Sequence, residues 1–338
     1  MHLLVTGGLG FIGSNFVRYW HKHHGEDSIT ILDKKTYAVN PKTEELLRGE
    51  LGDRLHIVEG DICDMEKVWP LVDACDIVVH FAAESHVDRS VMNPSVFLTT
   101  NVMGTFTLLE AAVRAGKKRF HHVSTDEVFG TLPLDSKEKF TEKSPYDPRS
   151  PYSASKAASD HLVRAYHETY GLPVTISNCT NNYGPLMFPE KVMPLYITRL
   201  FDGKPIPVYG KGLAVRDYIW VDDHARGIEL CIQKGVIGQT YLFGGDAERT
   251  TNEVAQTIAR QLGADPSLIR HTVDRPGHDP RYAIDFSKAT AELGWSPSRS
   301  FDEGIAQMIA WYKANEAWWR PLMHDAEQLA EKYLQGAI

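Results

Sequence analysis

The chain has 338 residues, of which 43% are hydrophobic and 24% charged, and its formal net charge is −8. This length allows about two domains, or one large domain with an added lobe, and the composition is that of a globular enzyme. The acidic balance excludes sequence-independent binding to DNA or RNA, which needs a basic surface, but it leaves a nucleotide ligand possible.

The cysteine pattern and the apolar runs narrow the class of protein further. The four cysteines are Cys63, Cys75, Cys179 and Cys231, and none forms a Cys-x-x-Cys pair, so we expect reduced thiols and no metal site. No apolar stretch approaches the length of a membrane-spanning helix, and the first residues lead straight into a strand without a signal peptide. We therefore expect a cytoplasmic protein with neither a membrane nor a nucleic acid as its partner.

Short β-branched runs alternate with helical patterns in the first half of the chain. The expected strands are His2–Thr6, Ser28–Leu32, Leu55–Val58, Asp76–Phe81, Arg119–Ser124 and Val174–Asn178. The expected helices are Phe11–His23, Met65–Val72, Pro94–Ala115 and Tyr152–Tyr170. Apolar runs without strict alternation are typical of strands that are buried on both faces. The order predicts an α/β fold with a Rossmann-like, doubly wound parallel sheet.

The pattern changes after about residue 181, because glycine and proline become frequent. We expect residues 1–181 to form the Rossmann domain, and residues 217–245, which again suggest a strand and a helix, to return to it. Residues 182–216 and 246–330 are expected to form a smaller C-terminal α/β substrate-binding lobe. The tail is helical in pattern, and Trp318 and Trp319 are expected to pack there.

Three glycines, Gly7, Gly10 and Gly13, follow the first expected strand and open the first helix. In a dinucleotide-binding fold such glycines allow a tight turn, a close approach to a pyrophosphate and tight packing of helix on strand. Asp33 ends the second strand 20 residues beyond Gly13, where an acid accepts the adenosine ribose hydroxyls and repels a 2′-phosphate. The motif predicts NAD as the cofactor, while the two lysines that follow Asp33 keep NADP open.

The third expected strand is followed by Asp61 and Ile62, which lie where the edge of an adenine would fall. An N-cap of the next helix is an alternative role for Asp61. The sequence leaves both roles open.

Tyr152 and Lys156 are four residues apart, which places them on one face of a helix. A nearby ammonium stabilises a phenolate, so we expect Tyr152 to act as a base well below its ordinary pKa of about 10. The lysine can also bond the ribose of a nicotinamide. Thr125, at the end of the fifth strand, would supply a hydroxyl between the tyrosine and a substrate oxygen.

Two adjacent carboxylates, Asp126 and Glu127, follow that hydroxyl directly. Such a pair can remove one proton and deliver another, as the elimination of water from a sugar requires. The alternative is an N-terminal cap or a solvated loop. The crevice at the carboxyl ends of the strands, where doubly wound sheets bind their ligands, favours the catalytic interpretation.

These motifs together identify a family. TGGLGFIG (6–13), Asp33, Thr125 and YSASK (152–156) resemble those of an extended short-chain dehydrogenase/reductase, and within it the chain resembles the dTDP-glucose 4,6-dehydratases. The matching segments are HFAAESHVDRS (80–90), TNVMGT (100–105), HHVSTDEVFG (121–130), SPYSASKAASDHLVRAY (150–166), NNYGPLMFPEKVMP (181–194), IPVYGKGLAVRDYIWVDDHARG (206–227) and DRPGHDPRYAID (274–285). They extend over most of the chain, to about Trp311.

The resemblance implies an NAD-dependent lyase of deoxysugar biosynthesis and a set of roles. Tyr152 would take the proton of the sugar C4 hydroxyl as C4 is oxidised, Glu127 would remove the C5 proton and Asp126 would protonate the departing C6 hydroxyl, before the hydride returns to C6. The implied cofactor residues are Gly7, Gly10, Phe11, Ile12, Gly13, Asp33, Lys34, Thr36, Asp61, Ile62, Ala82, Ala83, Ser85, Thr100, Tyr152 and Lys156. The implied substrate residues are Ser85, His86, Thr125, Asn181, Glu190, Lys191, Tyr209, Arg216, Asn252, Arg275, His278 and Tyr282.

Some positions leave alternatives open. Asn252 could instead be a helix N-cap, and Tyr209 a core aromatic residue. Leu9 and Phe129 differ from common family residues but stay apolar, whereas Pro280 replaces a usual arginine and leaves the preference for a thymidine or a uridine nucleotide open. A single methyl group distinguishes the two bases, worth about 1 kcal/mol in an apolar slot.

The assembly and the exact activity are also predictions at this point. The resemblance implies a homodimer through a four-helix bundle of the helices Pro94–Ala115 and Tyr152–Tyr170. A sugar-nucleotide 4-epimerase or decarboxylase, a UDP-glucose 4,6-dehydratase and a non-catalytic NAD-sensing protein remain alternatives, and the acid pair argues against an epimerase. Whether the product leads to rhamnose or to other deoxysugars stays open.

Overall fold

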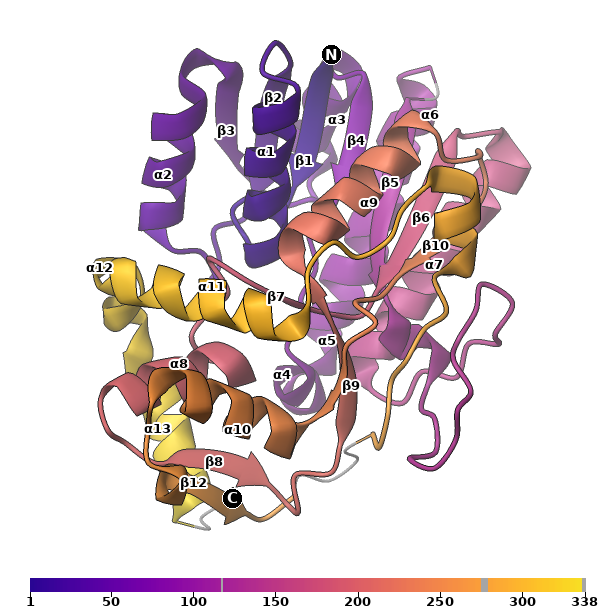
Figure 1. The fold of residues 1–338 in the computed structure, drawn as a ribbon. Coiled ribbons are helices and arrows are strands. Elements are labelled where there is room, and N and C mark those ends of the chain that lie inside the picture. The colour runs from indigo at the N-terminus through magenta and orange to yellow at the C-terminus, as the bar shows by residue number, and fades with distance from the viewer. Residues whose placement is uncertain (117, 275–278, 336–338) are drawn as a thin grey trace.

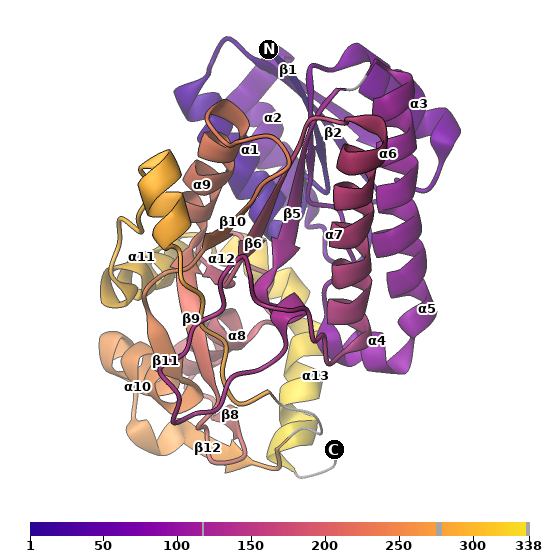
Figure 2. The same cartoon turned by 90° about the vertical axis from the view of Figure 1, so that its right-hand side faces the viewer.

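The computed structural model describes residues 1–116, 118–274 and 279–335, and its centre is a parallel sheet (Figures 1 and 2). The seven strands stand in the order β10-β6-β5-β4-β1-β2-β3. They are β1 (His2–Thr6), β2 (Ser28–Asp33), β3 (Leu55–Glu59), β4 (Ile77–His80), β5 (Arg119–Thr125), β6 (Val174–Cys179) and β10 (Thr240–Phe243). The doubly wound parallel sheet that the sequence predicts is confirmed, and Thr240–Phe243 joins it beside β6.

Helices cover both faces of this sheet. One layer contains α1 (Phe11–His23), α2 (Pro41–Leu51) and α9 (Val221–Gln233), and the other contains α3 (Met65–Ala74), α6 (Thr105–Arg114) and α7 (Pro151–Tyr170). Because side chains alternate along a strand, Leu3 packs into the first layer and Leu4 into the second. The helix α2 was not predicted, although the Asn40 side chain accepts a hydrogen bond from the Lys42 N–H and proline opens the helix.

The expected helix from residue 94 is continuous but not uniform. It comprises α5 (Pro94–Phe97), a π-helical stretch Leu98–Gly104 and α6. At Gly104 a Cβ would stand 2.4 Å from Ile62 Cδ1, so the missing side chain lets this helix approach the loop after β3. By length and composition the segment Pro94–Arg114 could cross a membrane, with a mean hydropathy of 1.4, but half of its most apolar window is buried within the protein. The sequence analysis overlooked this property of the segment.

A second α/β layer stands below the carboxyl ends of the large sheet in Figure 1. It contains α8 (Val192–Phe201), β8 (Ile206–Tyr209), α10 (Thr251–Leu262), β12 (Ile269–Thr272), α11 (Phe301–Ala314), α12 (Glu316–Trp319) and α13 (Met323–Leu334). A small sheet of β7 (Asn181–Tyr183), β9 (Val215–Trp220) and β11 (Glu248–Thr250) lies beside it, and α4 (Val87–Met92) follows β4. Short helical turns occupy Gly52–Arg54, Asp126–Phe129, Pro266–Leu268, Ala289–Leu293 and Arg320–Leu322. Trp318 and Trp319 are buried in the apolar core of this layer, as predicted.

The C-terminal helix α13 is joined to α8 and to the segment that follows α8 by two ion pairs of different exposure. Arg199, which is fully buried, donates from Nε to the Pro205 carbonyl (2.6 Å) and from a terminal nitrogen to Glu331 Oε1 (2.6 Å). Lys204 bonds Glu327 at 2.8 Å, but its side chain is 41% exposed. Because Arg199 is fully buried, although Glu331 is 50% exposed, the Arg199–Glu331 pair should hold α13 more strongly than the Lys204–Glu327 pair.

We predict that Arg199→Ala lowers the free energy of unfolding by about 2–4 kcal/mol, because it empties a packed site and leaves a buried carbonyl without a donor. Lys204→Ala, the matched control on the same pair of segments, should cost less than about 1 kcal/mol. Urea titrations of both variants measure the difference. Equal losses of unfolding free energy in the two variants would contradict the stronger role of the Arg199–Glu331 pair in holding α13.

Candidate active site

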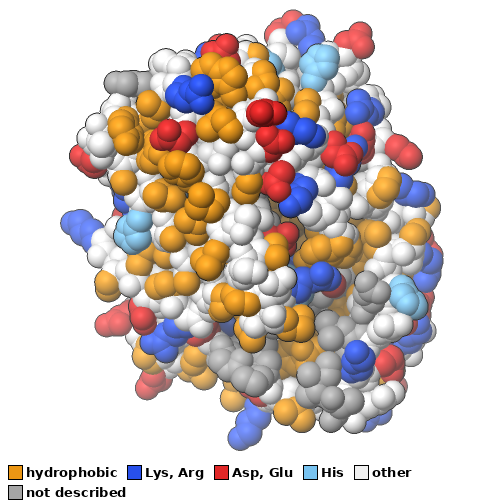
Figure 3. Space-filling model, turned by 180° about the vertical axis from the view of Figure 1, so that it is seen from behind, with side chains coloured by type: hydrophobic (Ala, Val, Ile, Leu, Met, Phe, Trp, Pro, Cys, Tyr) orange, Lys and Arg blue, Asp and Glu red, His pale blue; other side chains and the backbone are white. Residues whose placement is uncertain are grey.

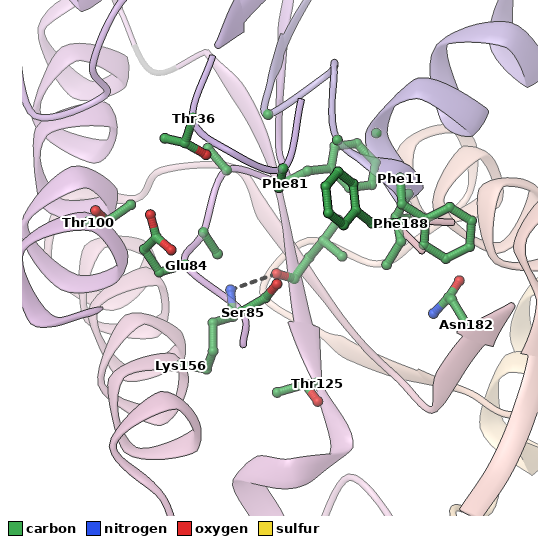
Figure 4. Close-up of a pocket in the computed structure, with 18 of the residues that line it drawn as sticks. Phe11, Thr36, Phe81, Glu84, Ser85, Thr100, Thr125, Lys156, Asn182 and Phe188 are labelled. Carbon is green, nitrogen blue, oxygen red and sulfur yellow. Dashed lines mark hydrogen bonds between the residues drawn. The ribbon is translucent and has the colours of Figure 1, made fainter. Parts of the chain in front are cut away.

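The main pocket opens at the carboxyl ends of the parallel strands, and Figure 4 shows part of its lining. This is the edge at which doubly wound sheets bind ligands. The following residues, predicted for the cofactor, all line it: Gly7, Gly10, Phe11, Ile12, Gly13, Asp33, Lys34, Thr36, Asp61, Ile62, Ala82, Ala83, Ser85, Thr100, Tyr152 and Lys156. The chain therefore brings these dispersed positions together around one cavity.

The glycine loop forms a cradle at the start of α1. Gly7 has a φ of +70°, and a Cβ there would stand 2.7 Å from backbone atoms of Ala82. A Cβ on Gly13 would stand 2.3 Å from the Gly7 carbonyl oxygen, so these two glycines are required by close packing. Gly10 caps α1 without a side-chain hydrogen bond, and its nearest neighbour would be 3.3 Å away. The exposed N–H groups of the first turn fit a diphosphate.

Asp33 lies beside this cradle as a buried carboxylate. Its oxygens accept hydrogen bonds from the N–H groups of Leu9 (3.0 Å) and Lys35 (2.9 Å). Burial raises the pKa of Asp33 against the effect of these two bonds. Lys34 pairs with Asp61 at 2.7 Å and Lys35 with Glu44 at 2.8 Å. Because both lysines already contact carboxylates, this arrangement favours NAD over a cofactor with a 2′-phosphate.

Asp61 does not cap the next helix, so the alternative role considered for it is wrong. The N-cap of α3 is Asp64, whose side chain accepts from the Glu66 and Lys67 N–H groups. Asp61 instead accepts from the Cys63 N–H (2.9 Å) and keeps its second oxygen on Lys34. It thus remains at the pocket wall with Ile62.

Three side chains from two elements form the predicted hydride-transfer group. Thr125 ends β5, and Tyr152 and Lys156 lie on α7 with their side chains almost fully buried. The helix starts at this place because Ser150 and Ser153 form a reciprocal capping box ahead of Tyr152. Lys156 donates from Nζ to the Val123 carbonyl at 2.8 Å, the dashed bond in Figure 4.

The expected low pKa of Tyr152 is not found. Burial, and then the charge of Glu127, raise the pKa of Tyr152 well above its ordinary value, while a hydrogen bond with Thr125 opposes the shift. Burial also lowers the pKa of Lys156, and its Nζ donates to a carbonyl oxygen. In this arrangement Tyr152 is therefore a neutral phenol, and its proton leaves only when additional positive charge or a substrate oxygen compensates.

The adjacent acids Asp126 and Glu127 have different environments. They form a short 3-10 turn in which Thr125 accepts a hydrogen bond from the Glu127 N–H (3.3 Å). Asp126 is 2% exposed, and its Oδ2 has no hydrogen-bond partner within the described part of the chain. Burial first, then the charges of Glu127 and Asp217, raise the pKa of Asp126 well above its ordinary value. Asp126 is thus a protonated acid, whereas Glu127 is only partly buried.

The residues predicted for the substrate divide into groups. Ser85, Thr125, Asn181, Glu190 and Lys191 line the pocket. His86 is next to it, with Nε2 3.8 Å from Glu190 Oε1. Arg275 and His278 lie outside the described residues.

Arg216 and Tyr282 approach the acid pair from the second layer. The Arg216 guanidinium lies 4.2 Å from the centre of the Tyr282 ring. Its charge opposes the rise in the pKa of Asp126, and burial followed by the Glu127 charge raises the pKa of Tyr282. Arg216 thus acts on Asp126 through its charge and Tyr282 lies within reach of the Glu127 charge, although neither is among the residues that line the pocket.

Two further predicted substrate residues stand away from the pocket lining. Tyr209 packs edge-on against Tyr333 at 4.7 Å. Asn252 donates to the Lys211 carbonyl (2.7 Å), and the N-cap of its helix is Thr250, so the alternative role of Asn252 as N-cap is wrong.

The pocket also contains residues that the sequence analysis did not single out. They include Tyr37, Glu84, Cys179, Thr180, Asn182, Met187 and Phe188. Thr180 is buried, and its hydroxyl has no partner among the described residues. Its position one residue after a strand that reaches the crevice is the sequence signal for it, but a lone hydroxyl outside a motif carries no distinctive pattern.

Comparisons with known proteins agree on one family. A family model described as GDP-mannose 4,6 dehydratase matches residues 4–308. The chain is 50% identical over 328 residues to a dTDP-glucose 4,6-dehydratase of Mycobacterium tuberculosis, covering 97% of this chain and 98% of that protein. An Escherichia coli protein of the same name is 47% identical, with 96% of each chain covered. DesIV, a dTDP-glucose 4,6-dehydratase of Streptomyces venezuelae solved with NAD bound, is 48% identical with a TM-score of 0.90, over 95% of this chain and all of that one.

We predict that Asp126→Asn makes the fold more stable at neutral and mildly alkaline pH. An acid whose pKa is raised by folding stabilises the protein below its ordinary pKa of about 4 and destabilises it progressively as the pH rises from there. The advantage of the variant over the wild type should therefore grow between about pH 5 and pH 8. Urea unfolding at several pH values measures it.

Asp135→Asn, at an exposed site outside the pocket, is the control and should show no such trend. A difference between wild type and Asp126→Asn that is constant with pH would contradict the protonated state of Asp126.

Proposed function

We propose that this chain, which belongs to the GDP-mannose 4,6-dehydratase family and within it to the dTDP-glucose 4,6-dehydratases, dehydrates dTDP-glucose to dTDP-4-keto-6-deoxyglucose with bound NAD. NAD⁺, when bound, accepts a hydride, gives it back and adds a positive charge to the pocket. The cradle of Gly7, Gly10 and Gly13 and the carboxylate of Asp33 are the groups that would hold it.

The side chains of the site have separate tasks in the proposed reaction. With the positive charge of bound NAD⁺ in the pocket, Tyr152 would release its own proton to solvent, and the phenolate, hydrogen-bonded to Thr125, would then take the proton of the C4 hydroxyl as C4 is oxidised. The ketone formed at C4 acidifies the proton at C5, which Glu127 removes. Asp126 gives its proton to the C6 hydroxyl, which leaves as water. The hydride then returns to C6 and a proton to C5, so the reaction has no net oxidation.

One observation carries this proposal: Asp126 and Glu127 are neighbours, but they differ in burial. Asp126 is nearly inaccessible and has a raised pKa, while Glu127 reaches solvent. An acid and a base of this kind are needed for the elimination of water but not for epimerisation at C4. The alternative of a 4-epimerase has no use for the pair.

The test is to incubate the purified protein with dTDP-glucose without added NAD, and then to detect the 4-keto-6-deoxy product after treatment with alkali. The proposal predicts turnover. Recovery of dTDP-galactose, or no reaction even with NAD added, would overturn it. A parallel incubation with UDP-glucose measures the preference for the nucleotide base. We expect the protein to prefer the thymidine nucleotide.

We predict that Glu127→Gln lowers turnover by about a hundredfold or more, because the amide cannot take the C5 proton. The affinity for dTDP-glucose, measured by calorimetry, should change little. Glu138→Gln, an exposed site outside the pocket, is the matched control and should keep wild-type turnover. Exchange of the C5 proton with solvent at the wild-type rate in Glu127→Gln would exclude Glu127 as the base.

We also propose that the protein is a homodimer through the helical layer behind the sheet. The exposed apolar side chains Val91, Met92, Val96, Leu98, Met103, Phe106 and Tyr170 all belong to α4, α5, α6, α7 or the π-helical stretch between α5 and α6. On the rear face apolar side chains gather over one half of the surface (Figure 3). A patch of this kind on helices of a globular protein marks an interface.

We expect Phe106→Glu to turn the dimer into a monomer, because it puts a charge into the centre of this apolar face. Sedimentation velocity at micromolar concentration measures the change. Val236→Glu, also at an exposed apolar site but outside the patch, should remain dimeric. A wild-type monomer would contradict the proposal.

A further inference from the structure

Asp160 is a buried ionisable residue that has no task in the proposed reaction. It lies on α7 one helical turn beyond Lys156 and two turns beyond Tyr152, so the three side chains share one side of the helix. The residue is completely inaccessible to solvent. A carboxyl group is rarely buried in this way unless donors and an opposite charge compensate it.

Three neutral groups donate to its carboxylate. His122 Nε2 on β5 is 3.1 Å from Oδ1, the Tyr146 hydroxyl is 2.8 Å from Oδ2, and Asn178 Nδ2 on β6 is 3.2 Å from Oδ2. Burial, followed by the charge of Lys156, lowers the pKa of His122 to about 4, so the imidazole is a neutral donor at neutral pH. Burial raises the pKa of the Tyr146 phenol, so it also keeps its proton.

These donors solvate the carboxylate but leave its negative charge uncompensated. Burial opposes ionisation of Asp160, yet its hydrogen bond with His122, the charge of Lys156 and the remaining contacts together lower its pKa. In return, the charge of Asp160 opposes the effect of burial on Lys156. Arg164 is a second cation in the region, but its contact is with the Tyr146 hydroxyl (2.7 Å).

The same network reaches the strand end that carries Thr125. Asn178 Nδ2 donates to the Thr125 carbonyl at 2.9 Å as well as to Asp160. Ser124 and Thr125 pair with Asn178 and Cys179 in the sheet, so Asn178 lies directly beside the catalytic strand end. One carboxylate thus connects α7, β5 and β6 near the end of β5 that carries Thr125.

We propose that Asp160 is a positioning residue of the hydride-transfer group: its buried carboxylate is the counter-charge of Lys156 and, through Asn178, fixes the end of β5 at Thr125. The expected effect of Asp160 on catalysis rests on the proposed function. Its effect on the titration of Lys156 does not, because that effect needs no substrate. Asp160 itself is not among the residues that line the pocket.

Other titratable groups also lie around Lys156 and must be considered in a titration. Burial raises the pKa of Cys179, and the thiol is neutral at physiological pH. Burial lowers the pKa of His80 on β4 well below its ordinary value, so it is neutral as well. Tyr152 on α7 keeps its proton, and the Glu127 carboxylate and Asp126 lie at the end of β5. Asp160 is thus the anion of the network whose charge raises the pKa of Lys156.

The experiment compares wild type, Asp160→Asn and Tyr146→Phe, each labelled with 13C at the lysine ε-carbons. Tyr146→Phe is the matched control, since it removes one donor to the same carboxylate and keeps the charge. The Lys156 signal, assigned by its absence in Lys156→Arg, is followed against pH in the proteins as purified. We expect the Lys156 titration to fall by about one pH unit or more in Asp160→Asn and to stay near the wild-type position in Tyr146→Phe.

The enzymatic readout is separate. For dTDP-glucose, Asp160→Asn should lower kcat by about tenfold to a hundredfold and shift the alkaline limb of its pH profile to lower pH, with KM nearly unchanged. An unchanged Lys156 titration in Asp160→Asn would overturn the proposal. If Asp160→Asn does not fold, the Lys156 titration of the wild type is the test, because an uncharged Lys156 at pH 7 would also overturn the proposal. Absence of wild-type turnover would contradict the proposed function. The role of Asp160 would then be decided by the NMR titration of Lys156 alone.

Discussion

The site depends on the withdrawal of ionisable groups from water at the carboxyl end of β5. The strand lies inside the sheet, between β4 and β6, and ends at Thr125, which Asp126 and Glu127 follow directly. A charged carboxyl is costly in such a place, so burial favours the protonated form of Asp126, whereas its neighbour Glu127 is only partly buried. Two adjacent and nearly identical groups thereby obtain opposite roles.

The parallel topology explains why the remaining groups arrive at the same edge. The glycine cradle follows β1, Asp33 ends β2, Thr125 ends β5 and Thr180 follows β6. In a parallel sheet all these ends point to one side, so segments far apart in the chain meet without special contacts between them. The second layer, with α8 and α10 to α13, then lies over this edge and brings Arg216 and Tyr282 to the acid pair.

Much of the large sheet and of the pocket lining could be predicted from local sequence patterns. The glycine spacing, the acid after β2, the Tyr152–Lys156 spacing and the Asp126–Glu127 pair are short-range signals, and they indicated the sheet and most of the pocket. The seventh strand was not predicted, because Thr240–Phe243 becomes a strand by pairing with β6, some 60 residues earlier in the chain. The strand suggested from residue 217 is β9, which belongs to the small sheet. The positions of Tyr209 and Asn252 depend on lobe packing, which no short pattern encodes.

The pKa of Tyr152 differs from the sequence prediction for a physical reason. The spacing of Tyr152 and Lys156 suggested that the ammonium would lower the pKa of the phenol, but spacing does not determine where Nζ donates. Burial acts on both groups and favours their neutral forms. Likewise, the two lysines after Asp33 suggested room for a 2′-phosphate until their carboxylate partners, contributed by α2 and by the loop after β3, became visible.

The protonation state of Asp126 is the most direct test of this account. Infrared difference spectra between the wild type and Asp126→Asn at pH 7, with isotope-labelled aspartate to identify the band, report whether this carboxyl group carries a proton. The account predicts the carbonyl stretch of a protonated carboxylic acid in the wild type, absent from the variant. A carboxylate band at Asp126 at pH 7 would contradict the separation of the two acids on which the proposed elimination depends.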